Sequence, residues 1–215
     1  MQIFMDTANI DEIRRGAALG VVDGVTTNPS LLAKEGVQYR DRVLEICAAV
    51  DGPISAECIS TELAPLLEEA RRVAAWHPNV VVKIPMGEVG LQAIKQLAKE
   101  GIKVNTTLIF SPNQALLAAK AGAAYVSPFV GRINDAGQDG MAVIRESVQI
   151  FDTYELDCQV LAASIRGPRD VTECALAGAH VATIPSAVLF QMMNHPLTDK
   201  GIEIFLRDAQ KYAPV

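Results

Sequence analysis

The chain has 215 residues, a length that suits one domain or at most two small ones. Hydrophobic residues make up 50%, enough for a packed core, and the formal net charge of −6 argues against a nucleic-acid backbone as the main partner. The first six residues do not resemble a signal peptide, and no apolar run is long enough to span a bilayer. We therefore expect a cytoplasmic protein that binds neither nucleic acid nor a membrane.

The four cysteines, Cys47, Cys58, Cys158 and Cys174, form no C-x-x-C pair and lack the spacing of a zinc site. A disulfide framework is not expected in a chain of this size with so few cysteines. We expect reduced thiols packed as small hydrophobic side chains, and no metal site.

Short strand-like runs alternate with longer helical patterns along the whole chain. A first helix is expected from about Ile10 with Asn9 as its cap, and later helical patterns include 61–75, 89–99 and 115–120. Glycines stand where three helices should end, at Gly101, Gly122 and Gly178. The strand-like runs cover residues 3–6, 24–27, 53–57, 80–85, 102–107, 125–128, 159–164 and 180–184.

About eight β/α units imply parallel strands and favour a single closed (β/α)8 TIM barrel over residues 1–215. An open doubly wound sheet is the alternative, but it usually carries a glycine-rich phosphate loop, and neither G-x-G-x-x-G nor a P-loop occurs. Residues from about 196 to 215 read as one further helix, which would cover the barrel base or pack on a neighbouring subunit.

In such a barrel the functional residues lie at the carboxyl ends of the strands. Polar residues gather at these predicted ends, although none of them is unusual alone. They are Asp6, Thr26, Asn28, Glu57, Lys83, Asn105, Thr107, Ser127 and Ser164.

Lys83 is the sharpest candidate, because it follows three valines in the most apolar run of the chain. Alternation places it on the face of Val81, opposite to Val82 and Ile84. If that face is the barrel interior, the desolvated ammonium releases its proton readily and supplies a nucleophilic amine that forms a Schiff base. The alternative is a lysine that extends from a strand edge to water.

Schiff-base chemistry also needs groups that move protons. Glu57 and Thr107, on strands near Lys83, could hold a water between them, and Asp6 could take a proton from a sugar hydroxyl. A helix-capping role for Asp6 and a solvated loop position for Glu57 remain open. Arg132, Ser164 and Arg166 follow the sixth and seventh strands and suit a phosphate dianion, unless the arginines form surface ion pairs.

These residues occur in strings that together resemble the transaldolase family from residue 1 to about 200. The strings are Asp6-Thr7-Ala8-Asn9, Thr26-Thr27-Asn28-Pro29-Ser30, Val82-Lys83-Ile84-Pro85, Asn105-Thr106-Thr107-Leu108, Ser127-Pro128-Phe129-Val130-Gly131-Arg132 and Ala162-Ala163-Ser164.

The short length resembles the small-subunit branch, which also contains fructose-6-phosphate aldolases. The resemblance implies a (β/α)8 barrel, a class I aldolase mechanism, sugar-phosphate substrates, and neither metal nor organic cofactor. It also implies a pentamer or decamer in which the C-terminal helix packs on a neighbour.

The resemblance further implies a role for each candidate residue. Lys83 would form the imine, Asp6 would be the base for carbon–carbon cleavage, and Glu57 and Thr107 would hold the catalytic water. The hydroxyls of the dihydroxyacetone portion would bind to Thr26, Asn28, Asn105 and Ser127. The phosphate would bind to Arg132, Ser164 and Arg166.

Two positions distinguish the transaldolases from the fructose-6-phosphate aldolases in this branch. The aldolases are similar but carry glutamine where Glu57 stands and tyrosine where Phe129 stands. Because Phe129 cannot donate a proton, the three-carbon unit should stay on Lys83 until an acceptor arrives, which predicts a transaldolase of the pentose phosphate pathway. An aldolase that releases free dihydroxyacetone and a non-catalytic phosphosugar-binding barrel remain alternatives. We expect His77, His180 and His195 to be structural.

Overall fold

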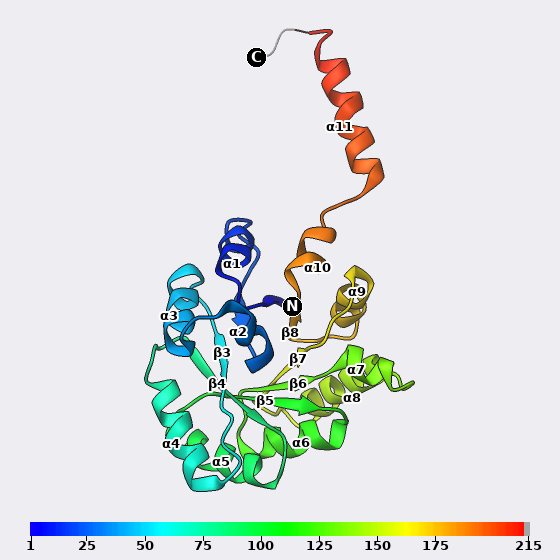
Figure 1. The fold of residues 1–215 in the computed structure, drawn as a ribbon. Coiled ribbons are helices and arrows are strands. Elements are labelled where there is room, and N and C mark those ends of the chain that lie inside the picture. The colour runs from blue at the N-terminus through cyan, green and yellow to red at the C-terminus, as the bar shows by residue number, and fades with distance from the viewer. Residues whose placement is uncertain (213–215) are drawn as a thin grey trace.

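A computed structural model describes residues 1–212, and within them eight parallel strands close into a barrel in chain order (Figure 1). The first strand pairs with both the second and the eighth, which closes the cylinder. This confirms the predicted (β/α)8 barrel. The strands are β1 Gln2–Asp6, β2 Gly24–Thr26, β3 Ile54–Glu57, β4 Val80–Pro85, β5 Val104–Ile109, β6 Tyr125–Pro128, β7 Gln159–Ala162 and β8 Val181–Ile184.

Helices surround the strands, and their ends follow the local signals of the sequence. The side chain of Asn9 accepts hydrogen bonds from the amides of Asp11 and Glu12 and so caps α1. Gly101, Gly122 and Gly178 adopt positive φ angles of 74°, 109° and 80°, as expected where a helix ends before a strand. The helices are α1 Ile10–Ala17, α2 Pro29–Glu35, α3 Tyr39–Ala49, α4 Leu63–Ala74, α5 Glu88–Lys99, α6 Pro112–Ala121, α7 Val130–Asp135, α8 Gly140–Thr153, α9 Pro168–Leu176, α10 Ser186–Gln191 and α11 Pro196–Ala209.

The carboxyl ends of two predicted strands are each off by two residues. The fifth strand runs to Ile109 rather than Thr107, because a register shift and the positive φ of Leu108 (59°) let pairing with β6 continue. The seventh strand ends at Ala162, and Ser164 lies beyond it with a φ of 60°. Ser164 is therefore a turn residue and not the last residue of a strand.

The core has two layers, and this decides which side chains face the barrel axis. The interior holds Phe4, Val81, Tyr125 and Val181, with Leu161 and Ala163, whereas Val82 and Ile84 belong to the larger layer between strands and helices. Because side chains alternate along a strand, the residues two positions later also point inward, at the mouth. Asp6, Lys83, Ser127 and Thr183 occupy these positions.

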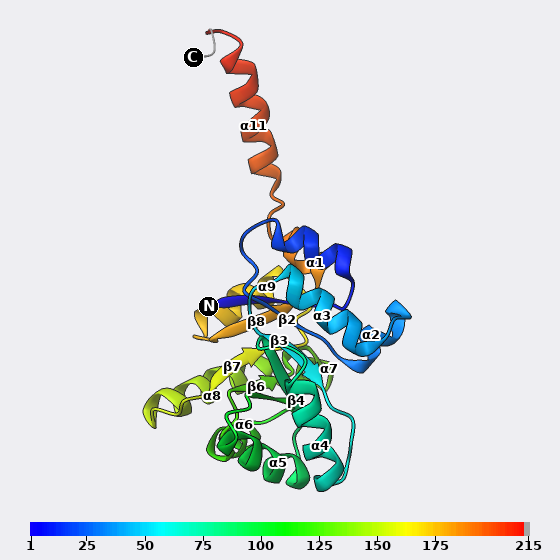
Figure 2. The ribbon, with the colours of Figure 1, turned by 90° about the vertical axis from the view of Figure 1, so that its left-hand side faces the viewer.

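Helix α11 stands away from the barrel in both views (Figures 1 and 2). None of its residues is buried, and Leu197, Phe205 and Leu206 are 70%, 74% and 64% exposed. The helix begins at Pro196, where one was predicted. Residues 213–215 of the predicted range lie outside the described residues. Within the described part of the chain, no helix has the length and apolar character needed to cross a membrane.

Candidate active site

The carboxyl ends of the strands surround a cavity of about 190 Å³. Nine of the twelve residues proposed from the sequence line it, and Glu57, Asn105 and Thr107 do not. The lining residues are Asp6, Thr26, Asn28, Lys83, Ser127, Phe129, Arg132, Ala163, Ser164, Ile165, Arg166, Thr183 and Pro185.

The Lys83 side chain is only 7% exposed and projects from β4 toward the barrel mouth. Its Nζ donates a hydrogen bond to the main-chain oxygen of Thr27 at 3.0 Å and lies 3.3 Å from Oε2 of Glu57. The ion pair follows from the register, since Glu57 and Lys83 are opposite each other on β3 and β4. The structure therefore excludes a lysine extended to water and places a carboxylate where it can exchange a proton with the amine.

Asp6 lies at the end of β1 and lines the same cavity. The hydroxyl of Thr26 donates to Oδ1 of Asp6 at 2.8 Å and lies 2.6 Å from the hydroxyl of Thr183. Burial raises the pKa of the Asp6 carboxyl above its ordinary value, although Lys83, Thr26 and Arg132 each lower it in part. Asp6 does not cap α1, because Asn9 performs that role. A buried carboxyl with a raised pKa at a cavity wall has the properties of a general base.

Three further residues form a hydrogen-bonded row across the barrel. Ser127 donates to the side-chain oxygen of Asn105 at 2.7 Å, and the Asn105 amide donates to Ser55 at 3.1 Å. Asn105 is fully buried, so it holds Ser127 toward the cavity rather than lining it. Thr107 is buried opposite Pro85 of β4.

The turns after β6 and β7 come together at one side of the cavity. The amide of Gly131 donates to the main-chain oxygen of Ser164 at 3.0 Å, and a Cβ on Gly131 would lie only 2.1 Å from that oxygen. The guanidinium of Arg132 lies 4.8 Å from the centre of the Phe129 ring. Arg166 forms an exposed ion pair with Asp135 at 2.7 Å. Glycine is thus needed for the close approach that brings both arginines to the cavity.

Sequence reasoning missed Thr183 on β8 and Ser55 on β3. Thr183 follows the interior residue Val181 at the same two-residue spacing that places Lys83 after Val81. This spacing could therefore have predicted that Thr183 lies at the barrel mouth. The Thr27 main-chain oxygen that holds Lys83 has no side-chain signal in the sequence.

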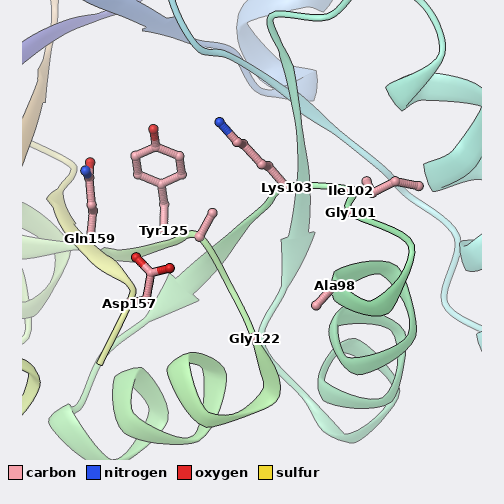
Figure 3. A pocket seen from close by; sticks show the side chains of 9 residues that line it. Ala98, Gly101, Ile102, Lys103, Gly122, Tyr125, Asp157 and Gln159 are labelled. Atoms are coloured by element: carbon pink, nitrogen blue, oxygen red, sulfur yellow. The ribbon is translucent and has the colours of Figure 1, made fainter. Parts of the chain in front are cut away.

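The other end of the barrel carries a hollow of about 400 Å³, shown in Figure 3. Lys103, Tyr125 and Gln159 line it at the starts of strands, and it contains none of the proposed site residues. The three histidines also lie away from the mouth: Nδ1 of His77, His180 and His195 accepts the amides of Asn79, Val160 and Leu197 respectively. None of the three lines the cavity at the mouth, and their structural role stays a prediction. No group of three metal-binding side chains occurs within residues 1–212.

Residues 3–213 match the family model described as transaldolase/fructose-6-phosphate aldolase. The chain belongs to this family. It is 60% identical over 211 residues to a protein of Herpetosiphon aurantiacus named "Probable transaldolase", covering 98% of this chain and 96% of that one. A protein of Desulforudis audaxviator with the same name is 59% identical over 208 residues, 97% of each chain.

Two of the solved structures that match the chain resemble it in fold alone. One is a soluble mutant of the membrane-associated (S)-mandelate dehydrogenase from Pseudomonas putida, with a TM-score of 0.62 at 12% identity. The match covers 88% of this chain and 68% of that one. Members of the transaldolase/fructose-6-phosphate aldolase family thus share their barrel with unrelated chemistry, and function must be argued from the site.

Proposed function

We propose that this protein is a transaldolase that moves a dihydroxyacetone unit through a Schiff base on Lys83. The observation that carries the proposal is the buried amine of Lys83 at the cavity wall, 3.3 Å from the Glu57 carboxylate. A ketose phosphate such as fructose 6-phosphate or sedoheptulose 7-phosphate would be the donor. An aldose phosphate such as erythrose 4-phosphate or glyceraldehyde 3-phosphate would be the acceptor.

In the first half of the reaction, Lys83 passes a proton to Glu57, and the Nζ then attacks the C2 carbonyl of the ketose. Glu57 moves the protons that let the carbinolamine lose water and become an iminium ion, with Thr107 holding that water. Asp6 then takes the proton of the C4 hydroxyl while the C3–C4 bond breaks. The aldose phosphate leaves, and the three-carbon enamine remains bound to Lys83.

In the second half the enamine carbon attacks the carbonyl of the acceptor, and Asp6 returns the proton. Hydrolysis of the new iminium ion releases the product ketose and restores Lys83. Arg132, Ser164 and Arg166 would hold the phosphate of each aldose. Thr26, Asn28, Asn105 and Ser127 would bind or orient the hydroxyls of the three-carbon unit.

The side chain of Phe129 supports transfer of the three-carbon unit to an acceptor over its release as free dihydroxyacetone. Its ring lines the cavity and packs at a tilt of 58° against Phe110, with ring centres 5.7 Å apart, and it has no hydroxyl to protonate the enamine. The enamine should therefore wait for an acceptor. Sugar interconversion in the pentose phosphate pathway is the proposed setting.

We also propose that the whole chain, 1–215, acts as one domain within a homo-oligomer, with α11 packed on a neighbouring subunit. The exposed apolar residues of α11 support this proposal, since they have no partner within the described part of the chain. A cytoplasmic location is proposed as well. The four cysteines are buried and free, which suits a reducing compartment.

The test combines borohydride trapping of the Schiff base with an assay of transfer to an acceptor aldose. Borohydride reduction with fructose 6-phosphate should attach a sugar fragment to the peptide that contains Lys83. The variant Lys83→Met should abolish the adduct, whereas Lys103→Met, at the other end of the barrel, should not. Erythrose 4-phosphate should accelerate product formation strongly. An absent adduct would refute the Schiff base, and fast release of dihydroxyacetone without acceptor would indicate an aldolase.

A further inference from the structure

Helix α3 sends two side chains, one turn apart, to main-chain oxygens beside the two carboxylates of the site. The hydroxyl of Tyr39 donates to the main-chain oxygen of Glu57 at 3.0 Å. Nη1 of Arg42 donates to the main-chain oxygen of Ala8 at 3.0 Å, two residues beyond Asp6. Because residues three apart share one face of a helix, both contacts come from the same side of α3.

Tyr39 fixes the backbone from which the Glu57 side chain reaches Lys83. Its ring packs edge-on against Trp76, with ring centres 5.1 Å apart at 87°. Burial raises the pKa of the Tyr39 hydroxyl, so that it stays a neutral donor at working pH. Rotation of the backbone at Glu57 would break this hydrogen bond, and the 3.3 Å contact between Glu57 and Lys83 depends on that backbone.

Arg42 holds the segment that follows Asp6. Its side chain is 8% exposed, and it also lies 3.4 Å from both Glu35 and Glu45. Only three residues, 7–9, separate β1 from α1, so a hydrogen bond to Ala8 leaves Asp6 little freedom. Glu35 ends α2, and Asn28, the N-cap of that helix, lines the cavity. One guanidinium therefore contacts both the loop that follows Asp6 and the last residue of the helix that Asn28 caps.

Attachment of α3 to the barrel does not need these polar contacts. Val43, Ile46 and Cys47 already bury the apolar face of the helix. A buried guanidinium is costly to desolvate, and apolar side chains often replace such groups without loss of stability. Tyr39 and Arg42 instead fix the positions of the main-chain carbonyl groups of Glu57 and Ala8, which apolar side chains could not do.

We infer that Tyr39 and Arg42 are positioning residues, Tyr39 for Glu57 in imine formation and Arg42 for Asp6 in carbon–carbon cleavage. The inference rests on the proposed Schiff-base function. It predicts that the two side chains control different steps of one reaction. A purely structural role would instead weaken both steps together with thermal stability.

Rapid mixing with fructose 6-phosphate, borohydride quenching and mass spectrometry separate the steps. In the wild type the trapped adduct should be the three-carbon unit, because cleavage has occurred. Tyr39→Phe should slow the appearance of any adduct by about 10–100-fold. Arg42→Met should form an adduct at nearly the wild-type rate but accumulate the uncleaved six-carbon phosphate, since cleavage slows by about 10–100-fold. Arg42→Lys should restore part of the three-carbon adduct, because an ammonium can still donate to Ala8.

Matched controls are available for both changes. Arg14→Met removes another partner of Glu45 without touching Ala8, and Tyr154→Phe removes a hydroxyl from a tyrosine that is 70% exposed. Both should react as the wild type does. Equal slowing of imine formation and cleavage in Tyr39→Phe or in Arg42→Met would overturn the inference. If Arg42→Met does not fold, equal slowing of the two steps in Arg42→Lys would overturn it. Failure of the wild type to form any adduct would instead refute the proposed function.

Discussion

Gly131 is the position where one added methyl group should separate phosphate binding from imine chemistry. In Gly131→Ala the new Cβ would lie 2.1 Å from the Ser164 main-chain oxygen, 2.7 Å from Nε of Arg166 and 3.0 Å from Oγ of Ser164. The nearest of these is backbone, so the turns after β6 and β7 must separate by roughly 1 Å to reach an ordinary contact. The hydrogen bond from the Gly131 amide to Ser164 would lengthen with them.

The magnitude follows from that displacement. A misplacement of about 1 Å can cost roughly 100-fold in rate, so kcat/KM for fructose 6-phosphate should fall by about that factor. Overpacking of this kind costs about 1–3 kcal/mol, which in a chain of this length lowers Tm by roughly 2–12 °C. Trapping of unphosphorylated dihydroxyacetone should change little, because Lys83 and Glu57 pair on the other side of the barrel mouth.

The assay compares both substrates in Gly131→Ala and in Gly87→Ala. Gly87 is a suitable control, since its backbone is extended and a Cβ there would have no neighbour within 4 Å. Retention of wild-type kcat/KM for fructose 6-phosphate by a folded Gly131→Ala would refute the reasoning. Equal losses with both substrates would also refute it, because the phosphate grip would then not be the part that moved.

Other substitutions test the remaining parts of the site. Lys83→Met should abolish trapping and lower stability by up to ~3 kcal/mol, because the Glu57 carboxylate loses its buried partner; adding Glu57→Gln should recover part of the Tm. Asp6→Asn should slow release of glyceraldehyde 3-phosphate by about 10²–10⁴-fold. Burial raises the pKa of Asp6 in the folded state above its value in the unfolded chain. The protonated carboxyl therefore contributes its full stabilisation at pH values below the unfolded-state pKa, and this contribution is lost as the pH rises through the folded-state pKa. Melting curves should therefore show a higher Tm for Asp6→Asn than for the wild type near pH 7, but no gain near about pH 3. Phe129→Tyr should increase the release of free dihydroxyacetone without acceptor, measured by coupled reduction, and an unchanged ratio of release to transfer would contradict the role given to Phe129.

The barrel could be predicted because its signals are local. Alternating patterns, an asparagine cap and glycines at helix ends each act over a few residues, and the eight units follow from them. The two strand errors arose at Leu108 and Ser164, which adopt positive φ angles although neither is glycine. Such conformations depend on tertiary contacts, here the pairing of β5 with β6 and the close approach of Gly131, and local propensity cannot supply them.

The site was predictable to the extent that strand ends and alternation define it. Lys83 and Asp6 follow interior residues by two positions, and both line the cavity. That Asn105 contacts substrate stays a prediction, and its place behind Ser127 depends on a hydrogen bond between strands that no spacing predicts. Tyr39 and Arg42 lie on a helix, outside the strand-end rule, and only the fold brings them to Glu57 and Ala8.

The structure also separates the two carboxylates by position. Glu57 does not line the cavity and contacts the Lys83 amine at 3.3 Å, whereas Asp6 lines the cavity and is hydrogen-bonded to Thr26. The carboxylate in contact with nitrogen is suited to move protons while the imine forms or hydrolyses. The one at the cavity wall is suited to take a proton from substrate. Different surroundings on β1 and β3 can thus divide acid–base work between two similar groups. Exchanging Asp6 and Glu57 by a double substitution should therefore not preserve activity, because the position of Glu57 lies opposite Lys83 whereas that of Asp6 lies opposite Thr26.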